Sequence, residues 1–138
     1  MAGDVWGQFV RRFGIREVRE FYRSTEGVAK YDNFGCGVAM EGKVGFEGPI
    51  MRRCNALTYL VKYDHETGLP WRDPRTGFCL QAKVGEAGEA IGRVMDLSVY
   101  ADYLNNPEAN EKKLIRNGFK KGDLFQRMGD LLVRDKDG

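Results

Sequence analysis

The sequence predicts a mixed α/β fold, and three observations support this class. Apolar residues follow Asp4 at helical spacing, stretches rich in β-branched and aromatic residues lie between residues 58 and 100, and a second helix signal follows Pro107. The chain has 138 residues, of which 42% are hydrophobic, so it is long enough to bury a core. We therefore expect one folded domain built from both helices and strands.

The charge balance argues against nucleic acid as a partner. Lys and Arg number 22 and Asp and Glu number 20, so the net charge is +2, well below what binding to a phosphate backbone usually requires. No stretch approaches the roughly 18 consecutive apolar residues of a membrane span. The N-terminal MAGDVWGQFVRR also lacks the apolar region of a secretion signal. We expect a soluble, unprocessed chain.

The cysteines indicate a reduced, intracellular protein. Cys36, Cys54 and Cys79 are odd in number and widely spaced, and His65 is the sole histidine that could join them as a metal ligand. A zinc site or a disulfide framework is the less favoured alternative. We expect three buried thiols.

The N-terminal region predicts a helix, a strand and a polar loop. Asp4 can cap a helix that ends at Gly14, and residues 17–22 read as a strand that enters the loop YRSTEG. Helix, strand and loop in this order deliver a polar loop to the carboxyl edge of a parallel sheet, where ligands commonly bind.

The central region predicts loops and then a hairpin. Glycine recurs so often between residues 35 and 48 that we expect loop broken by short extended pieces. Residues 58–63 (TYLVKY) read as a strand, and a loop with two prolines separates them from FCLQAKV at residues 78–84. We interpret the two segments as a long-looped hairpin.

Further along, residues 89–95 (EAIGRVM) predict a short strand with Gly92 as a weak point or bulge. Residues 107–116 predict a helix, because proline stands early, acids follow it and cations come late. We interpret the basic residues of this region as a solvated helix face, with a nucleic-acid patch as the alternative. They are Lys112, Lys113, Arg116, Lys120 and Lys121.

The C-terminal segment predicts a strand and a turn. Residues 131–133 are apolar, and residues 135–138 (DKDG) are typical of a hairpin turn whose return strand follows at once. An unpaired strand would expose backbone donors and acceptors. This pattern leads us to expect that the sequence is part of something longer.

An ordered series of motifs resembles one known family. The segments EFYRSTEG, VGFEGPI, LVKYD, RDPRTGFC, GEAGEAIGRV, YLNNPEANEKKL and KGDLFQRMGDLLVRDKDG resemble, in this order and spacing, the fatty acid transport protein and very-long-chain acyl-CoA synthetase branch of the adenylate-forming enzymes. The resemblance spans nearly the whole chain. It implies part of the AMP-binding N-terminal domain, with a helix, one parallel-sheet strand and the nucleotide loop in residues 1–34 and a β-rich subdomain with one helix in residues 35–138.

The resemblance assigns roles to the loop after the first strand. By it, Tyr22 stacks on adenine, Thr25 hydrogen-bonds a phosphate oxygen, and Glu26 ligates Mg²⁺. Each role suits the chemistry, because an aromatic ring pairs with an adenine face, a hydroxyl donates to phosphate, and a hard dication takes carboxylate oxygen. Without the resemblance, the loop reads as a simple turn or helix cap.

The resemblance also assigns Asp130, in QRMGDL, to the ribose, since an ionised carboxylate can accept two hydroxyl donors. Asp123 is the weaker candidate for this role. Two residues depart from the family pattern. Arg23 stands where glycine or alanine is usual, and Met128 stands where threonine is usual, which exchanges a hydroxyl for bulk.

The function implied is that of an ATP-dependent long-chain or very-long-chain fatty acid–CoA ligase. Such an enzyme uses ATP and Mg²⁺ to form an acyl adenylate, and CoA then displaces AMP. By the family pattern, a phosphate loop with its lysine lies upstream of these motifs and a small domain with a catalytic lysine lies downstream, so we expect the 138-residue chain to be inactive alone.

The adenine nucleotide and a fatty acyl substrate are the expected partners. The full-length relative is expected to be intracellular, whether cytoplasmic, peroxisomal or membrane-associated, and any membrane association would come through segments outside these residues. Two alternatives remain: a pseudoenzyme or binding module with residual nucleotide or acyl affinity, and an unrelated β-rich interaction domain that uses its basic helix.

Overall fold

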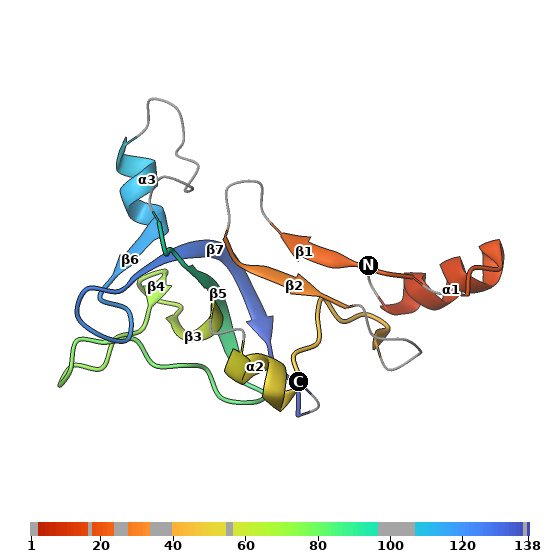
Figure 1. Cartoon of the computed structure of the whole chain (residues 1–138), viewed down its shortest axis with the longest axis horizontal. Coiled ribbons are helices and arrows are strands. Elements are labelled where there is room, and N and C mark those ends of the chain that lie inside the picture. Colours follow the sequence, from red (N-terminus) through yellow and green to blue (C-terminus); the bar gives the residue numbers. More distant parts are fainter. Residues whose placement is uncertain are drawn as a thin grey trace.

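A curled antiparallel sheet organises the protein (Figure 1). The computed structural model describes residues 3–16, 18–23, 28–33, 40–54, 57–96, 107–136 and 138. Within these residues the sheet has five strands in the order β4-β3-β5-β7-β6, and neighbouring strands run antiparallel. The strands are β3 (Thr58–Asp64), β4 (Leu69–Pro70), β5 (Ala87–Arg93), β6 (Leu114–Arg116) and β7 (Leu124–Val133).

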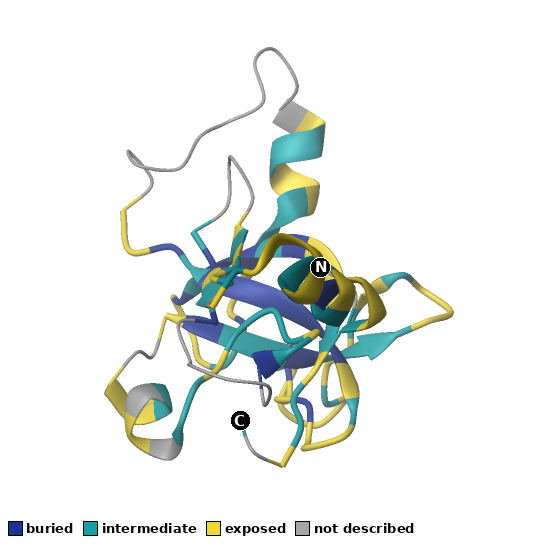
Figure 2. Ribbon diagram, turned by 90° about the vertical axis from the view of Figure 1, so that its right-hand side faces the viewer, coloured by how far each residue is buried: buried dark blue, intermediate teal, exposed yellow. Residues whose placement is uncertain are grey.

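Successive side chains of a strand point to opposite sides, and the sheet carries a buried cluster on each of its two faces. Figure 2 shows the buried residues concentrated on the strands of this sheet. On one face the rings of Tyr59, Phe119 and Phe125 pack edge-on against one another, with centroids 5.0 to 5.7 Å apart. This face, called the aromatic face below, also holds Val61, Cys79, Ile91 and Ile115, and the other, called the hairpin face, holds Ala29, Ala90 and Met128.

A short hairpin covers the hairpin face. Strands β1 (Phe21–Arg23) and β2 (Lys30–Asp32) pair antiparallel, and Tyr22 and Tyr31 pack on the cluster beneath them. The strand expected at residues 17–22 is observed only from Phe21, and the pairing seen among the described residues is antiparallel. Its observed partner is the nearby strand β2.

The base of this hairpin is held by a fully buried amide. The Asn33 side chain accepts a hydrogen bond from the Glu20 backbone N–H at 2.6 Å and donates to the Lys43 carbonyl at 2.9 Å. A buried amide with both groups bonded avoids the cost of unpaired polar atoms. Asn33 thereby fixes the hairpin to the segment that follows it.

Three helices lie around the sheet in the described part of the chain. Helix α1 (Gly3–Phe13) confirms the predicted N-terminal helix, and Gly14, which follows it, has a φ of 61° that suits a helix exit. It projects away from the sheet in Figure 1. Helix α2 (Pro49–Cys54) was not expected from the sequence. Helix α3 (Pro107–Lys113) is shorter than the predicted helix, because the next three residues form β6 and pair with β7.

Strand predictions in the β-rich region were mostly confirmed. Strand β3 matches residues 58–63, and β5 overlaps the predicted strand at residues 89–95. The segment 78–84 forms no continuous strand, but Leu80 and Ala82 exchange backbone hydrogen bonds of 2.9 Å with β3, so it runs along the predicted partner. Gly92 is not at the bulge. Its α-carbon faces Val28 and Ala29 so closely that a Cβ would lie 2.5 Å from the Ala29 nitrogen.

The thiols differ from expectation in one respect. Cys79 is buried, and this burial raises the pKa of its thiol, whereas Cys54 is exposed; both are unbridged. Cys36 lies outside the described residues. Among the residues that the structure describes, no helix has the length and apolar character needed to cross a bilayer.

Candidate functional site

Two of the predicted nucleotide contacts meet in the structure. The Tyr22 phenol, from β1, donates a hydrogen bond to Oδ2 of Asp130, from β7, although 108 residues separate them in the chain. Burial, then the hydrogen bond to Asp130 and the charge of its carboxylate, raise the pKa of the Tyr22 phenol far above its usual value. Thr25 and Glu26, the other predicted contacts, lie outside the described residues.

A bulge in β7 presents Asp130 to the hairpin. Arg127 pairs with Ile91 and Leu131 pairs with Glu89, so three residues of β7 stand opposite the one residue Ala90 of β5. Gly129, inside the bulge, has a φ of 84°, which glycine adopts without strain. The extra residues break the regular alternation of side chains at this point, and Asp130 contacts Tyr22 there.

Strand β7 holds both ends of the predicted nucleotide loop. On one side of residues 24–27, Tyr22 is bonded to Asp130; on the other, the Val28 backbone N–H donates to Oε1 of Gln126 at 3.1 Å. Gln126 is 3% exposed, so this contact is shielded from water. Gln126 was not predicted from the sequence, although an amide within a buried strand was a signal for it.

The two residues that depart from the family pattern have structural partners. Arg23 lies 3.6 Å from the Asp32 carboxylate, across the hairpin, and its guanidinium stands over the Phe21 ring. Met128 is buried against Ala29 and Ala90, beneath Tyr22. Arg23 therefore belongs to the hairpin surface, whereas Met128 belongs to the core that supports the hairpin.

Asp123, the weaker candidate for the ribose contact, closes a turn. Its Oδ2 accepts the backbone N–H groups of Phe119 and Lys120, both at 3.0 Å. The carboxylate is buried in that turn, just before β7. The geometry favours Asp130 over Asp123 as the carboxylate available to a ligand near Tyr22.

A groove lies beside the second tyrosine of the hairpin. It has a volume of about 450 Å³, and neither Tyr22 nor Asp130 lines it. The Tyr31 ring stands 6.1 Å from the Tyr22 ring, and burial followed by the charge of Glu47 raises the pKa of Tyr31. The lining combines apolar and charged residues, including Tyr31, Leu60, Leu132, Lys43, Arg52 and Arg134.

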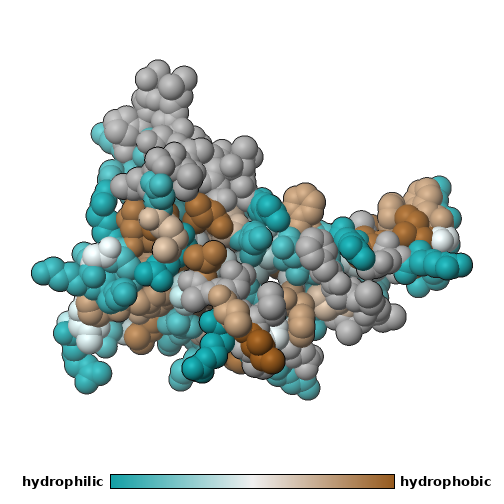
Figure 3. Space-filling view, viewed as in Figure 1, coloured by the Kyte–Doolittle hydropathy of each residue, from teal (hydrophilic) through white to brown (hydrophobic). Residues whose placement is uncertain are grey.

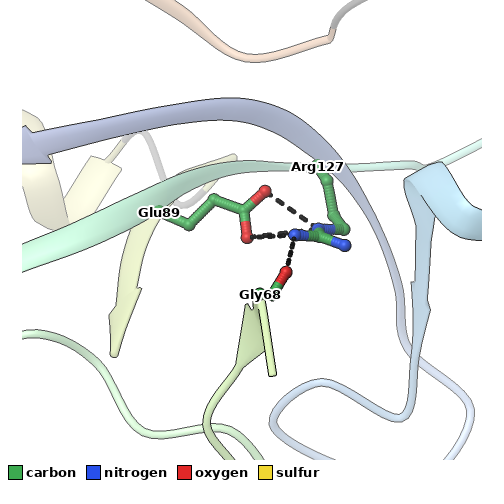
Figure 4. Close-up of polar contacts among 3 residues, drawn as sticks. All are labelled: Gly68, Glu89 and Arg127. Atoms are coloured by element: carbon green, nitrogen blue, oxygen red, sulfur yellow. Dashed lines mark hydrogen bonds and ion pairs between the residues drawn. The ribbon is translucent and has the colours of Figure 1, made fainter. Parts of the chain in front are cut away.

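A buried ion pair stands beside the β7 bulge (Figure 4). Arg127 Nε donates to both carboxylate oxygens of Glu89, at 2.9 and 3.1 Å, and a second guanidinium nitrogen donates to Glu89 at 3.0 Å and to the Gly68 carbonyl at 2.9 Å. Glu89 is 1% exposed. This pair was not predicted from the sequence, although a glutamate inside the apolar run AGEAIG was a signal for it.

Metal ligands are not clustered in the described part of the chain. There, no group of three or more His, Cys, Asp or Glu side chains is arranged to hold a metal ion. His65 packs edge-on against Tyr63, with ring centroids 5.2 Å apart. The predicted magnesium ligand Glu26 lies among the residues not described, so its role stays a prediction.

Comparison with known proteins reveals relatives over the whole chain. The chain is 41% identical, over all its residues, to "Isopenicillin N epimerase component 1" of Hapsidospora chrysogena, of which it covers 23%. It is 36% identical to "Long-chain fatty acid transport protein 2" of Rattus norvegicus, over 99% of the chain and 21% of that protein. It is 37% identical to "Long-chain fatty acid transport protein 3" of Homo sapiens, over 98% of the chain and 19% of that protein.

No family model and no solved structure matches the chain. The sequence relatives nevertheless agree with the ordered motifs, because both cover the chain from end to end. The chain spans about a fifth of the length of these relatives. It is therefore a member of the long-chain fatty acid transport protein family and corresponds to one stretch of those proteins.

Proposed function

We propose that this chain forms part of the adenine nucleotide site of an ATP-dependent fatty acid–CoA ligase. The observation that carries the proposal is the anchoring of residues 22 and 28 to β7, through Asp130 and Gln126. These contacts hold both ends of the loop that contains Thr25 and Glu26 at the strand that carries Asp130. A nucleotide site assembled from this loop and this strand would use residues that are far apart in the sequence.

Each residue contributes a separate contact in the proposed site. The Tyr22 ring supports the adenine face, the Thr25 hydroxyl donates to phosphate, and the Asp130 carboxylate accepts the ribose hydroxyls. Glu26 would hold Mg²⁺, which neutralises phosphate charge when it is bound. Asp130 already accepts the Tyr22 phenol, so the same bond orients both side chains before the nucleotide arrives.

The reaction proposed for the whole protein has two steps. A carboxylate oxygen attacks the α-phosphorus of ATP, which forms an acyl adenylate and releases pyrophosphate. The sulfur of CoA then attacks the acyl carbon and AMP leaves. A fatty acid is the proposed substrate because the transport proteins are named for long-chain fatty acids. Another relative, the epimerase component, is named for isopenicillin N instead.

The 138-residue chain alone is proposed to bind nucleotide weakly and to form no acyl-CoA. The cations and backbone N–H groups that would stabilise the triphosphate belong to family motifs outside these residues, and each such contact typically contributes a factor of about 10² to 10³ in rate. Millimolar affinity for AMP, about 4 kcal/mol, is the expected level.

A binding module without catalysis is the second candidate. The burial of Met128 favours it, since the residue that replaces the family's threonine faces the core beneath Tyr22 and offers no hydroxyl to a nucleotide. This candidate predicts tight binding of an acyl adenylate or of a partner protein, in place of weak binding of AMP.

Isothermal titration of the chain with AMP and with a non-hydrolysable acyl adenylate tests the proposal. Asp130→Ala and Glu26→Ala should weaken binding of both ligands. Glu111→Ala, which removes an exposed carboxylate bonded to Arg116, serves as the control and should leave binding unchanged. Micromolar binding that both site substitutions abolish would favour the binding module, and equal binding by all variants would exclude the site.

A further inference from the structure

The buried ion pair joins the two sides of the β7 bulge. Arg127 is the last paired residue of β7 before the bulge, and Leu131 is the first paired residue after it. Glu89 is the β5 partner of Leu131, yet its carboxylate receives the guanidinium of Arg127. The side-chain pair therefore crosses diagonally over the segment that contains Asp130.

The ion pair of Glu89 and Arg127 and the contact between Tyr22 and Asp130 lie on opposite faces of the sheet. Glu89 lies two residues before Ile91 and Arg127 two residues after Phe125, so both side chains share the aromatic face with these two. Tyr22 packs with Ala90 and Met128 on the hairpin face. The ion pair thus stands behind the bulge, out of reach of a ligand at Tyr22, and any effect on the site must pass through the backbone of β7.

A third anchor ties this arrangement to the turn between β3 and β4. The Arg127 guanidinium also donates to the Gly68 carbonyl at 2.9 Å, so one side chain connects β5, β7 and the β3–β4 turn. A bidentate guanidinium–carboxylate pair has restricted geometry in distance and in plane. Four hydrogen bonds from one guanidinium, three to Glu89 and one to Gly68, restrict how far the strand can slip at the bulge.

Stability alone does not account for a buried pair of charges. The desolvation of two ions commonly offsets their attraction, and well-packed apolar residues in their place are often neutral or stabilising. A role in fixing the strand register explains the pair better here. Strand β7 has two extra residues opposite Ala90 and could pair with β5 in another register. Such a shift would change the position of Asp130.

We propose that Glu89 and Arg127 are positioning residues for Asp130, which fix the β7 bulge so that the Asp130 carboxylate meets Tyr22 and the nucleotide. The effect on the nucleotide rests on the proposed function, whereas the effect on the contact between Tyr22 and Asp130 does not. Neither residue touches the ligand; they act through the strand.

The test replaces the pair by apolar side chains of similar size, Glu89→Leu with Arg127→Met. Thermal melting reports stability, the ring signals of ¹³C-labelled tyrosine report the Tyr22–Asp130 contact, and titration with AMP reports affinity. Tyr22→Phe assigns the signal, and Asp130→Ala gives its position when the contact is absent. The control is Glu111→Leu with Arg116→Met, which removes an exposed ion pair outside the bulge.

We expect the double variant to fold with a Tm no lower than that of the parent chain, its Tyr22 signal to move to the Asp130→Ala position, and AMP to bind about tenfold more weakly. The control pair should change neither the signal nor the affinity. A folded double variant with the parent's Tyr22 signal and AMP affinity would overturn the proposal.

The experiment also distinguishes a failure of the proposed nucleotide function from a failure of the double variant to fold. If Asp130→Ala leaves AMP binding unchanged, the proposed nucleotide function fails, and the Tyr22 signal still decides whether the pair positions Asp130. If the double variant does not fold, Glu89→Gln provides the same readouts with less disturbance. Its Tyr22 signal should move part of the way toward the Asp130→Ala position, and an unmoved signal would contradict the proposal.

Discussion

At the scale of a single residue, the Tyr22 phenol makes the stability of the fold depend on pH. Its phenol is held protonated by burial and by the Asp130 carboxylate, which raise its pKa well above the usual value. A group whose pKa is higher in the folded than in the unfolded state adds stability that is complete below the unfolded pKa and is lost as pH rises toward the folded pKa. For a tyrosine, this loss begins near pH 10.

Removal of this phenol should therefore flatten the alkaline part of the stability profile. From about pH 10 upward, the free energy of unfolding of the parent chain should decrease more steeply than that of Tyr22→Phe. Urea unfolding at several pH values measures both. Tyr31 remains in both proteins, and its pKa is raised mainly by burial and by Glu47, with a smaller part from Tyr22 that the substitution also removes. Parallel profiles would show that Tyr22 titrates as an ordinary phenol.

At the scale of the element, β7 depends on the charge pair that it buries. Arg127→Ala leaves the Glu89 carboxylate enclosed without its cation, which typically costs about 3 to 5 kcal/mol of unfolding free energy. Arg116→Ala provides the matched control, because its pair with Glu111 is more than half exposed on both sides and should contribute less than about 1 kcal/mol. Urea unfolding compares the two, and equal losses would mean that Glu89 is not effectively buried.

The bulge of the same strand depends on glycine. Gly129 adopts a φ of 84°, a region where a Cβ introduces strain, so Gly129→Ala should lower the free energy of unfolding by about 1 to 2 kcal/mol. Gly48→Ala is the control, since a Cβ there meets Phe46 at an ordinary 3.6 Å and the φ of Gly48 is not in the left-handed region. Chemical denaturation measures both variants, and a neutral Gly129→Ala would argue that the bulge relaxes.

At the scale of the whole molecule, the surface carries large apolar side chains. Figure 3 shows apolar surface at the outer part of α1 and around α2. Such surface favours association between copies, as do strand edges that are not covered. The most exposed apolar side chains include Phe13, Phe21, Ile50, Val133 and Met95.

We expect the chain, when it is expressed alone, to associate in a concentration-dependent way. Sedimentation velocity over a range of concentrations should show the average mass rising with concentration, and Ile50→Gln with Phe13→Gln should reduce the rise. Both side chains are more than half exposed, so the change should not disturb the core. A monomer at every concentration with a sharp, reversible melting transition would contradict this expectation.

Elements with strong local patterns could be predicted from the sequence, and weaker ones could not. Helix α1 and strand β3 follow from the spacing of apolar residues and from β-branched composition. Helix α3 was predicted too long, because local propensity extends through residues 114–116 while pairing with β7 makes them a strand. Helix α2 was missed because it is six residues long and follows a glycine-rich segment.

The sequence by itself determined the family and the identity of the candidate contacts, since an ordered series of motifs is a property of the chain alone. Tertiary structure decided which of these residues meet. Tyr22 reaches Asp130 across 108 residues and Glu89 reaches Arg127 across 38, and no local pattern encodes such pairings. They arise because strand register and the β7 bulge place distant backbone segments side by side, and a shift of one residue would turn these side chains to the other face.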